Sequence, residues 1–75
     1  MRMKLPEIKD CSGDVTVSSW KKSVGESVAK GELLLQVECD KASIDIYSEM
    51  NGTLARIFFQ EGEIVKPGDM VAQIE

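Results

Sequence analysis

Lys41 is the residue of this chain best placed for covalent chemistry. Asp40 and Lys41 are the centre of a symmetric sequence pattern, in which residues at equal distances on the two sides are both apolar or both polar. Opposed residues of a two-residue hairpin share a face, and the faces alternate along each strand. The lysine is therefore expected at the tip, where its amine is reachable and its base is fixed by two strands. The mirrored pairs are Leu35/Ile46, Gln36/Asp45, Val37/Ile44 and Glu38/Ser43.

The neighbours of this lysine suit an attachment point. Asp40 and Ala42 are short, so they would leave the amine accessible to a modifying enzyme and could help it to recognise the site. Glu38, with Asp45 and Glu49, forms an acidic surround that is either the solvated face of the hairpin or a surface that steers partners. Asp-Lys lacks the glycine or asparagine typical of primed hairpin turns, so the pairing pattern carries the prediction instead.

The two cysteines, Cys11 and Cys39, could form one disulfide. They show neither the spacing of a metal site nor the framework of a small secreted protein, so we expect two reduced thiols. Cys39 shares strand parity with Val37, which favours a small apolar residue at the base of the hairpin. The pattern does not favour a redox role.

Composition disfavours several function classes. The net charge of -4 and the pI near 4.7 argue against nonspecific binding to nucleic acid or to anionic membranes. The absence of histidine removes the commonest general base and metal ligand, so we expect a non-catalytic protein. The apolar run at residues 33–35 is too short for a membrane span, and the first residues lack the features of a secretory signal. These features predict a cytoplasmic protein, or one of the mitochondrial matrix in a eukaryote.

An internal repeat organises the chain. Residues 16–38 align without a gap with residues 53–75, which predicts two similar half-domains. If a pseudo-twofold axis relates them, the Lys41 tip and the C-terminus should lie at opposite ends of the molecule. The identical pairs are Thr16/Thr53, Gly25/Gly62, Glu26/Glu63, Val28/Val65, Gly31/Gly68, Gln36/Gln73 and Glu38/Glu75.

The apolar residues predict one all-β domain over residues 1–75, because they fall in short runs between glycine-containing turns. Pro67-Gly68 suits a type II turn. In both repeats the apolar spacing slips from two to three, after Val17 and after Leu54, which predicts equivalent bulges. The predicted strands are Lys4–Ile8, Val15–Lys21, Ser27–Val28, Leu33–Cys39, Ala42–Tyr47, Gly52–Phe59, Ile64–Val65 and Met70–Ile74.

These residues resemble a known family. The runs at 37–46, 52–54 and 62–68 are similar to those of lipoyl domains from the acyltransferase components of 2-oxo acid dehydrogenase complexes, within the biotinyl/lipoyl attachment family. The resemblance covers nearly the whole chain. It implies a flattened barrel or sandwich of two antiparallel sheets, with lipoate joined by an amide bond to Lys41. It also implies that Cys11, Ser12, Gly13 and Asp14 form a surface loop near the lysine that the decarboxylating component recognises.

The same resemblance implies a carrier function. Such a domain swings acyl groups and electrons between the active sites of its complex. The implied partners are a lipoate ligase or lipoyl transferase, a thiamine-dependent decarboxylating component, an acyltransferase core and dihydrolipoyl dehydrogenase, with no nucleic acid or membrane. The Ala42-Ser43 continuation favours the pyruvate dehydrogenase branch. The chain departs from the family at residues 47–50, where a proline-containing segment is usual.

Two other functions stay open. A biotin carboxyl carrier domain would share the architecture, but its lysine normally lies between methionines, whereas Asp40 and Ala42 flank Lys41 here. An unmodified barrel used only for protein interaction is the second, although modules of that kind usually lack a lysine at the tip. A glycine-cleavage carrier would also bear lipoate, but that family is longer.

Overall fold

The computed structural model describes residues 2–8, 11 and 13–75. These residues form strands, turns and loops, with no helix that could cross a bilayer. The all-β prediction is confirmed. The strands are β1 (Arg2–Lys4), β2 (Val15–Trp20), β3 (Ser27–Val28), β4 (Leu33–Glu38), β5 (Ser43–Tyr47), β6 (Gly52–Ile57), β7 (Ile64–Val65) and β8 (Met70–Ile74).

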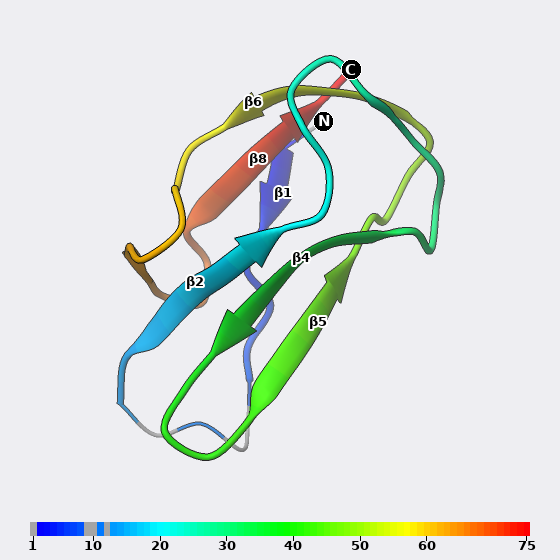
Figure 1. Ribbon diagram of the computed structural model, residues 1–75. Helices are drawn as coiled ribbons and strands as arrows, with labels where there is room; N and C mark the ends of the chain where they lie inside the picture. Colours follow the sequence, from blue (N-terminus) through cyan, green and yellow to red (C-terminus); the bar gives the residue numbers. More distant parts are fainter. Residues whose placement is uncertain (1, 9–10, 12) are drawn as a thin grey trace.

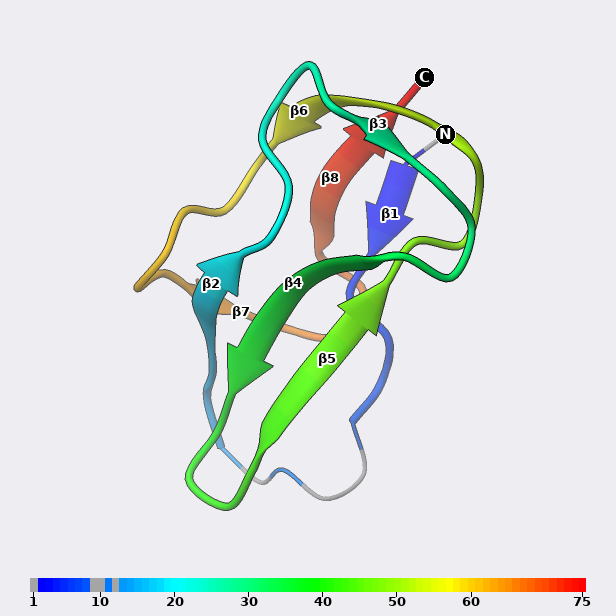
Figure 2. The same ribbon diagram turned by 45° about the vertical axis from the view of Figure 1, so that its right-hand side comes forward.

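The strands form two antiparallel four-stranded sheets. One has the order β1-β8-β6-β3 and the other β5-β4-β2-β7. Figures 1 and 2 show the sheets facing each other as a sandwich, which is elongated, with principal extents of 32 × 20 × 18 Å. Among the described residues no ladder joins the sheets into a closed barrel, so the sandwich form of the prediction holds.

The internal repeat is realised in the topology. Strands β2, β3 and β4 of the first copy correspond to β6, β7 and β8 of the second. The short strands are exchanged, because β3 pairs with β6 and β7 pairs with β2. Turn hydrogen bonds repeat as well, since the Gly25 amide donates to the Leu54 carbonyl and the Gly62 amide donates to the Val17 carbonyl. Each half therefore completes the sheet of the other.

Both predicted bulges are present. The β2–β4 register shifts between Val17 and Ser19, and the β6–β8 register shifts between Leu54 and Arg56. These positions are equivalent in the two repeats. An extra residue bends a strand and increases its twist, so the two long strands curve around the core in the same way.

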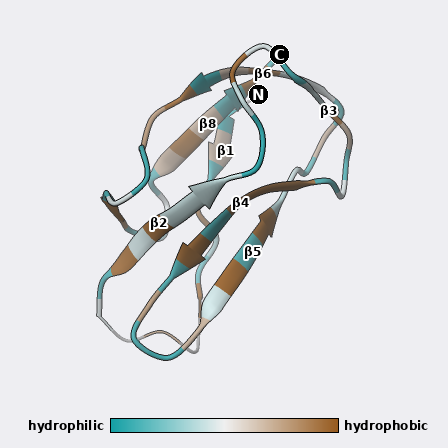
Figure 3. Cartoon of the chain, in the orientation of Figure 1, coloured by the Kyte–Doolittle hydropathy of each residue, from teal (hydrophilic) through white to brown (hydrophobic). Residues whose placement is uncertain are grey.

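The core lies between the sheets. In β5, and in β4 from Leu35 onward, hydrophobic and hydrophilic residues alternate (Figure 3), which gives these segments one face toward the interior. Leu34 and Leu35 are both fully buried because the β4–β5 register shifts between Leu33 and Leu35. The buried apolar residues are Met3, Leu5, Val15, Val17, Val28, Leu34, Leu35, Val37, Ile46, Leu54, Val65, Val71, Ala72 and Ile74.

The first strand differs from the prediction. It was expected at residues 4–8, but β1 ends at Lys4. Pro6 has no N–H, so a ladder cannot continue through it. Leu5 is held instead by turn hydrogen bonds: its amide donates to the Asp69 carbonyl, and its carbonyl accepts from the Gly68 amide. The other strands have the expected positions to within two residues at each end.

The predicted turn at Pro67-Gly68 is present. The Asp69 amide donates to the Lys66 carbonyl over 2.9 Å, and Gly68 has a φ of 90°. A positive φ at the third position of a turn is what type II requires, and glycine takes it without steric cost.

Candidate functional site

The hairpin that carries Lys41 has the predicted register. The pairs Leu35/Ile46, Gln36/Asp45, Val37/Ile44 and Glu38/Ser43 are all formed between β4 and β5. The inward members Leu35, Val37 and Ile46 are buried, so the hairpin is anchored on the core through one face. This provides a rigid base for the tip.

The turn itself uses ordinary backbone angles. The Cys39 amide donates to the Ala42 carbonyl over 2.9 Å, which leaves Asp40 and Lys41 as the two tip residues. No described residue other than glycine has a positive φ, so the turn is not of a primed type. Asp-Lys is therefore compatible with the hairpin although it lacks a turn glycine.

Lys41 is exposed, and so are its neighbours Asp40 and Ala42. Within the described part of the chain no hydrogen bond or ion pair engages the Lys41 ammonium group. Acylation of the amine would remove a charge on which none of these neighbours depends. The site thus fits an amide-linked group such as lipoate.

The tip and the C-terminus lie at opposite ends of the molecule (Figures 1 and 2), as the pseudo-twofold axis predicted. The β4–β5 turn is at one end of the long sandwich. Strand β8 runs to the other end, and the antiparallel strand β1 begins there. A group attached to Lys41 therefore points away from the C-terminal end.

The predicted recognition residues fall into two groups. Glu38 is exposed at the end of β4, close to the tip. Gly13 and Asp14 are exposed just before β2, Cys11 is partly buried, and Ser12 lies outside the described residues. Asp14 precedes β2, in which Thr16 pairs with Glu38 at the end of β4 next to the hairpin tip.

A disulfide joins these two groups. The Sγ atoms of Cys11 and Cys39 are bonded, with 5.9 Å between the Cα atoms and a sequence separation of 28. The prediction of two reduced thiols is wrong, because only the folded chain brings the segment before β2 back to the base of the hairpin. Both cysteines also pack against the core. The cross-link therefore fixes Cys11 to a residue two positions before Lys41.

The chain leaves β5 through a turn that sequence reasoning missed. Ser48 is buried, its hydroxyl donates to the Met50 carbonyl over 2.6 Å, and it accepts from the Met50 amide at 3.3 Å. The Ser48 amide also donates to the Glu32 carbonyl. A serine that bonds the backbone two residues onward is a known turn former, so the Ser48 hydroxyl stabilises this turn.

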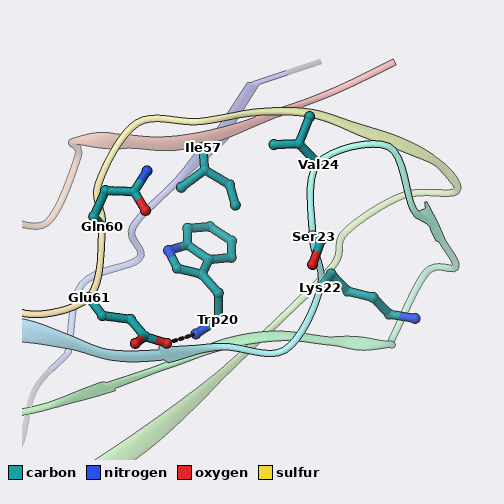
Figure 4. A pocket seen from close by; sticks show the side chains of 7 residues that line it. All are labelled: Trp20, Lys22, Ser23, Val24, Ile57, Gln60 and Glu61. Atoms are coloured by element: carbon teal, nitrogen blue, oxygen red, sulfur yellow. Dashed lines mark hydrogen bonds between the residues drawn. The ribbon is translucent and has the colours of Figure 1, made fainter.

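A hollow of about 590 Å³ lies at the far end of β2 (Figure 4). Trp20 pairs with Leu35, whereas Thr16 pairs with Glu38 next to the hairpin tip, so the hollow is remote from Lys41. The Trp20 indole N–H donates to the Phe59 carbonyl over 2.8 Å, which holds the ring across the opening. In the described residues no group of side chains could hold a metal ion. The lining residues are Trp20, Lys22, Ser23, Val24, Ile57, Gln60 and Glu61.

Comparison with known proteins settles the family. The model of the biotin/lipoyl family, described as "Biotin-requiring enzyme", matches residues 1–74. This chain belongs to the biotinyl/lipoyl attachment domain family. The solution structure of the lipoyl domain of the 2-oxoglutarate dehydrogenase complex from Azotobacter vinelandii is similar to it, with a TM-score of 0.79 and 31% identity over 99% of this chain and 94% of that one.

Curated relatives of this lipoyl domain are much longer proteins. The succinyltransferase component of the 2-oxoglutarate dehydrogenase complex from Staphylococcus saprophyticus is 35% identical over 96% of this chain and 17% of that protein. The corresponding component from Pseudomonas aeruginosa is 32% identical over 99% of this chain and 18% of that protein. The lipoyl domain therefore spans less than a fifth of these relatives.

These matches fix the class of the domain. It is a lipoyl domain of the 2-oxo acid dehydrogenase acyltransferase kind, a carrier module and not a catalytic one. The preference for the pyruvate branch, drawn from Ala42-Ser43, is not supported, because both relatives named above are of the 2-oxoglutarate type. The urea carboxylase of Kluyveromyces lactis has a TM-score of 0.68 at 22% identity over 97% of this chain and 7% of that one, which shows a shared fold only.

Proposed function

We propose that residues 1–75 form one carrier domain in which lipoate is amide-linked to the Nζ atom of Lys41. The observation that carries this proposal is the exposed amine at the tip of a hairpin whose other face is buried in the core, an amine that no described residue engages. Membership of the lipoyl-domain family supports the identity of the attached group.

The domain itself contributes a fixed base from which the lipoyl arm reaches the active sites of its partners. A bound lipoyl group supplies a dithiolane that accepts an acyl group together with two electrons. The hairpin holds the base of this arm still, so the arm sweeps a limited volume around each partner and its effective concentration there is high. Asp40, Ala42 and Glu38 at the tip, with the loop at residues 11–14, are the proposed recognition surface.

The proposed partners and substrate are inferred from the names of the similar proteins. We propose a lipoate ligase or lipoyl transferase for loading, and a thiamine-dependent decarboxylating component, an acyltransferase core and dihydrolipoyl dehydrogenase for the cycle. The names of the relatives support 2-oxoglutarate as the oxo acid and a succinyl group as the cargo. A cytoplasmic or mitochondrial-matrix location goes with these partners.

Intact mass tests the attachment. The domain is coexpressed with a lipoate ligase or with a biotin ligase, and Lys66→Ala, at another exposed lysine, is the matched control. We expect one lipoyl addition on the wild type and on the control, none on Lys41→Ala, and the same circular dichroism for all three. Biotin addition, or lipoate on another lysine, would overturn the assignment.

The oxo acid needs a separate measurement. The lipoylated domain is offered to decarboxylating components specific for 2-oxoglutarate or for pyruvate, and the acyl adduct is read by mass. Succinyl loading in preference to acetyl loading is expected. The reverse preference would leave the carrier function standing and refute the substrate class.

A further inference from the structure

A second sulfur centre lies beside the attachment lysine. The Cys11–Cys39 disulfide includes a residue only two positions before Lys41. Two residues span at most about 7 Å between Cα atoms, so the cystine and the root of the proposed arm are close neighbours. Both cysteines are partly exposed, so solvent reaches this part of the surface.

We propose that this cystine is a redox-active site, which accepts electrons from the dithiol form of the lipoyl group on Lys41. The inference rests on the proposed attachment. A lysine side chain extended by lipoate reaches on the order of 10 Å from its Cα atom, which exceeds the backbone span to Cys39. The arm is therefore long enough to reach the cystine from its own point of attachment.

The exchange balances within the domain. The Sγ–Sγ bond of Cys11 and Cys39 breaks, and one S–S bond forms between the two sulfurs of the arm. Two electrons and two protons pass to the cysteines, which become thiols. Attack by a thiolate on a disulfide sulfur is the ordinary route for such a transfer. The reductant is the dithiol that the proposed cycle produces, so no other reactant is needed.

Two arguments favour a redox-active cystine over a passive cross-link. Disulfides of proteins in reducing compartments are usually catalytic or redox-sensing, and the proposed location is such a compartment. The bond also ties Cys11, one of the candidate recognition residues, to the lysine hairpin, so its opening would separate Cys11 from the hairpin while the arm is reduced. Reduction of the arm would thus also change the proposed recognition surface.

Counting thiols after reduction of the arm tests the proposal. Lipoylated domain with an intact cystine, at about 10 µM, is treated with NADH and dihydrolipoyl dehydrogenase, quenched with acid and alkylated with N-ethylmaleimide. The control is Lys41→Arg with the same enzyme, NADH and about 10 µM free lipoamide. Peptide mass reports alkylation at Cys11 and Cys39. Reduction of both proteins by a phosphine identifies the fully alkylated product.

A tethered dithiol has an effective concentration of about 1 mM, so we expect the cystine to open about 100-fold faster in the lipoylated protein than in the control. The rate should not depend on domain concentration. Equal rates of cystine opening in the two proteins would refute the redox site. So would a product in which the reduced arm is alkylated while Cys11 and Cys39 remain disulfide-bonded. Because the mass of the starting protein records lipoylation independently, either result would leave the attachment proposal intact.

Discussion

Opening the Cys11–Cys39 disulfide should lower the stability of the domain strongly. The bond closes a loop with a sequence separation of 28. In the chain-entropy model a cross-link over a loop of this length restricts the unfolded chain by about 3.5 kcal/mol. For a domain of this size each kcal/mol shifts the melting temperature by about 4–8 °C. The reduced protein should therefore melt roughly 20 °C below the oxidised one, yet remain folded at 25 °C.

Thermal unfolding followed by circular dichroism, with and without a phosphine reductant, measures this difference. The background is Lys41→Arg, so that no arm takes part. The matched control carries Cys11→Ala and Cys39→Ala, which keep small apolar side chains where both cysteines pack against the core. It should melt close to the reduced protein and should not respond to reductant. Oxidised and reduced proteins that melt within about 5 °C of each other would refute the reasoning, since the cross-link would then barely constrain the unfolded chain.

Two further predictions concern packing and pH. Gly52→Ala should destabilise the domain by about 1–3 kcal/mol in urea unfolding, because its new Cβ would lie 2.6 Å from the Glu75 carbonyl oxygen. The control is Thr53→Ala at the exposed neighbouring position, which should cost less than about 1 kcal/mol. The Ala29 amide, and then Lys22, lower the pKa of Glu32 below its ordinary 4.5. Glu32 thus adds stability above pH 4.5 that is lost as the pH falls through its folded-state pKa, and Glu32→Gln should remove that part of the acid dependence. An unchanged acid limb in urea titrations would contradict this assignment.

Local alternation made much of the fold predictable. The register of the lysine hairpin follows from the pairing of Val37 with Ile44 and its neighbours, because a slip of one residue would turn every apolar side chain outward. The bulges after Val17 and Leu54 are visible as slips in apolar spacing, and the repeat shows each of them twice. These features depend on residues close together in the sequence.

Other features depend on contacts that spacing does not encode. The disulfide requires Cys11 and Cys39, which are 28 positions apart in the sequence, to lie side by side in the fold. The sequence contains two cysteines in either case, so it does not show whether they are bonded or reduced. The exit turn at Ser48 depends on a buried hydroxyl that a turn search based on glycine and proline passes over. The dipeptide Ala42-Ser43 favoured the pyruvate branch, whereas the named relatives are of the 2-oxoglutarate type, so two residues after Lys41 do not distinguish the branches.

The exchange of β3 and β7 between the two repeats bears on how such a fold can arise. A half-length chain would leave an open ladder edge, and a second identical chain could fill it. Two such chains would assemble around a twofold axis, and a fusion through the segment that holds Lys41 would give the present connectivity. A homodimer made continuous in this way keeps a duplicated interior and gains one segment that occurs only once, and Lys41 lies in that segment.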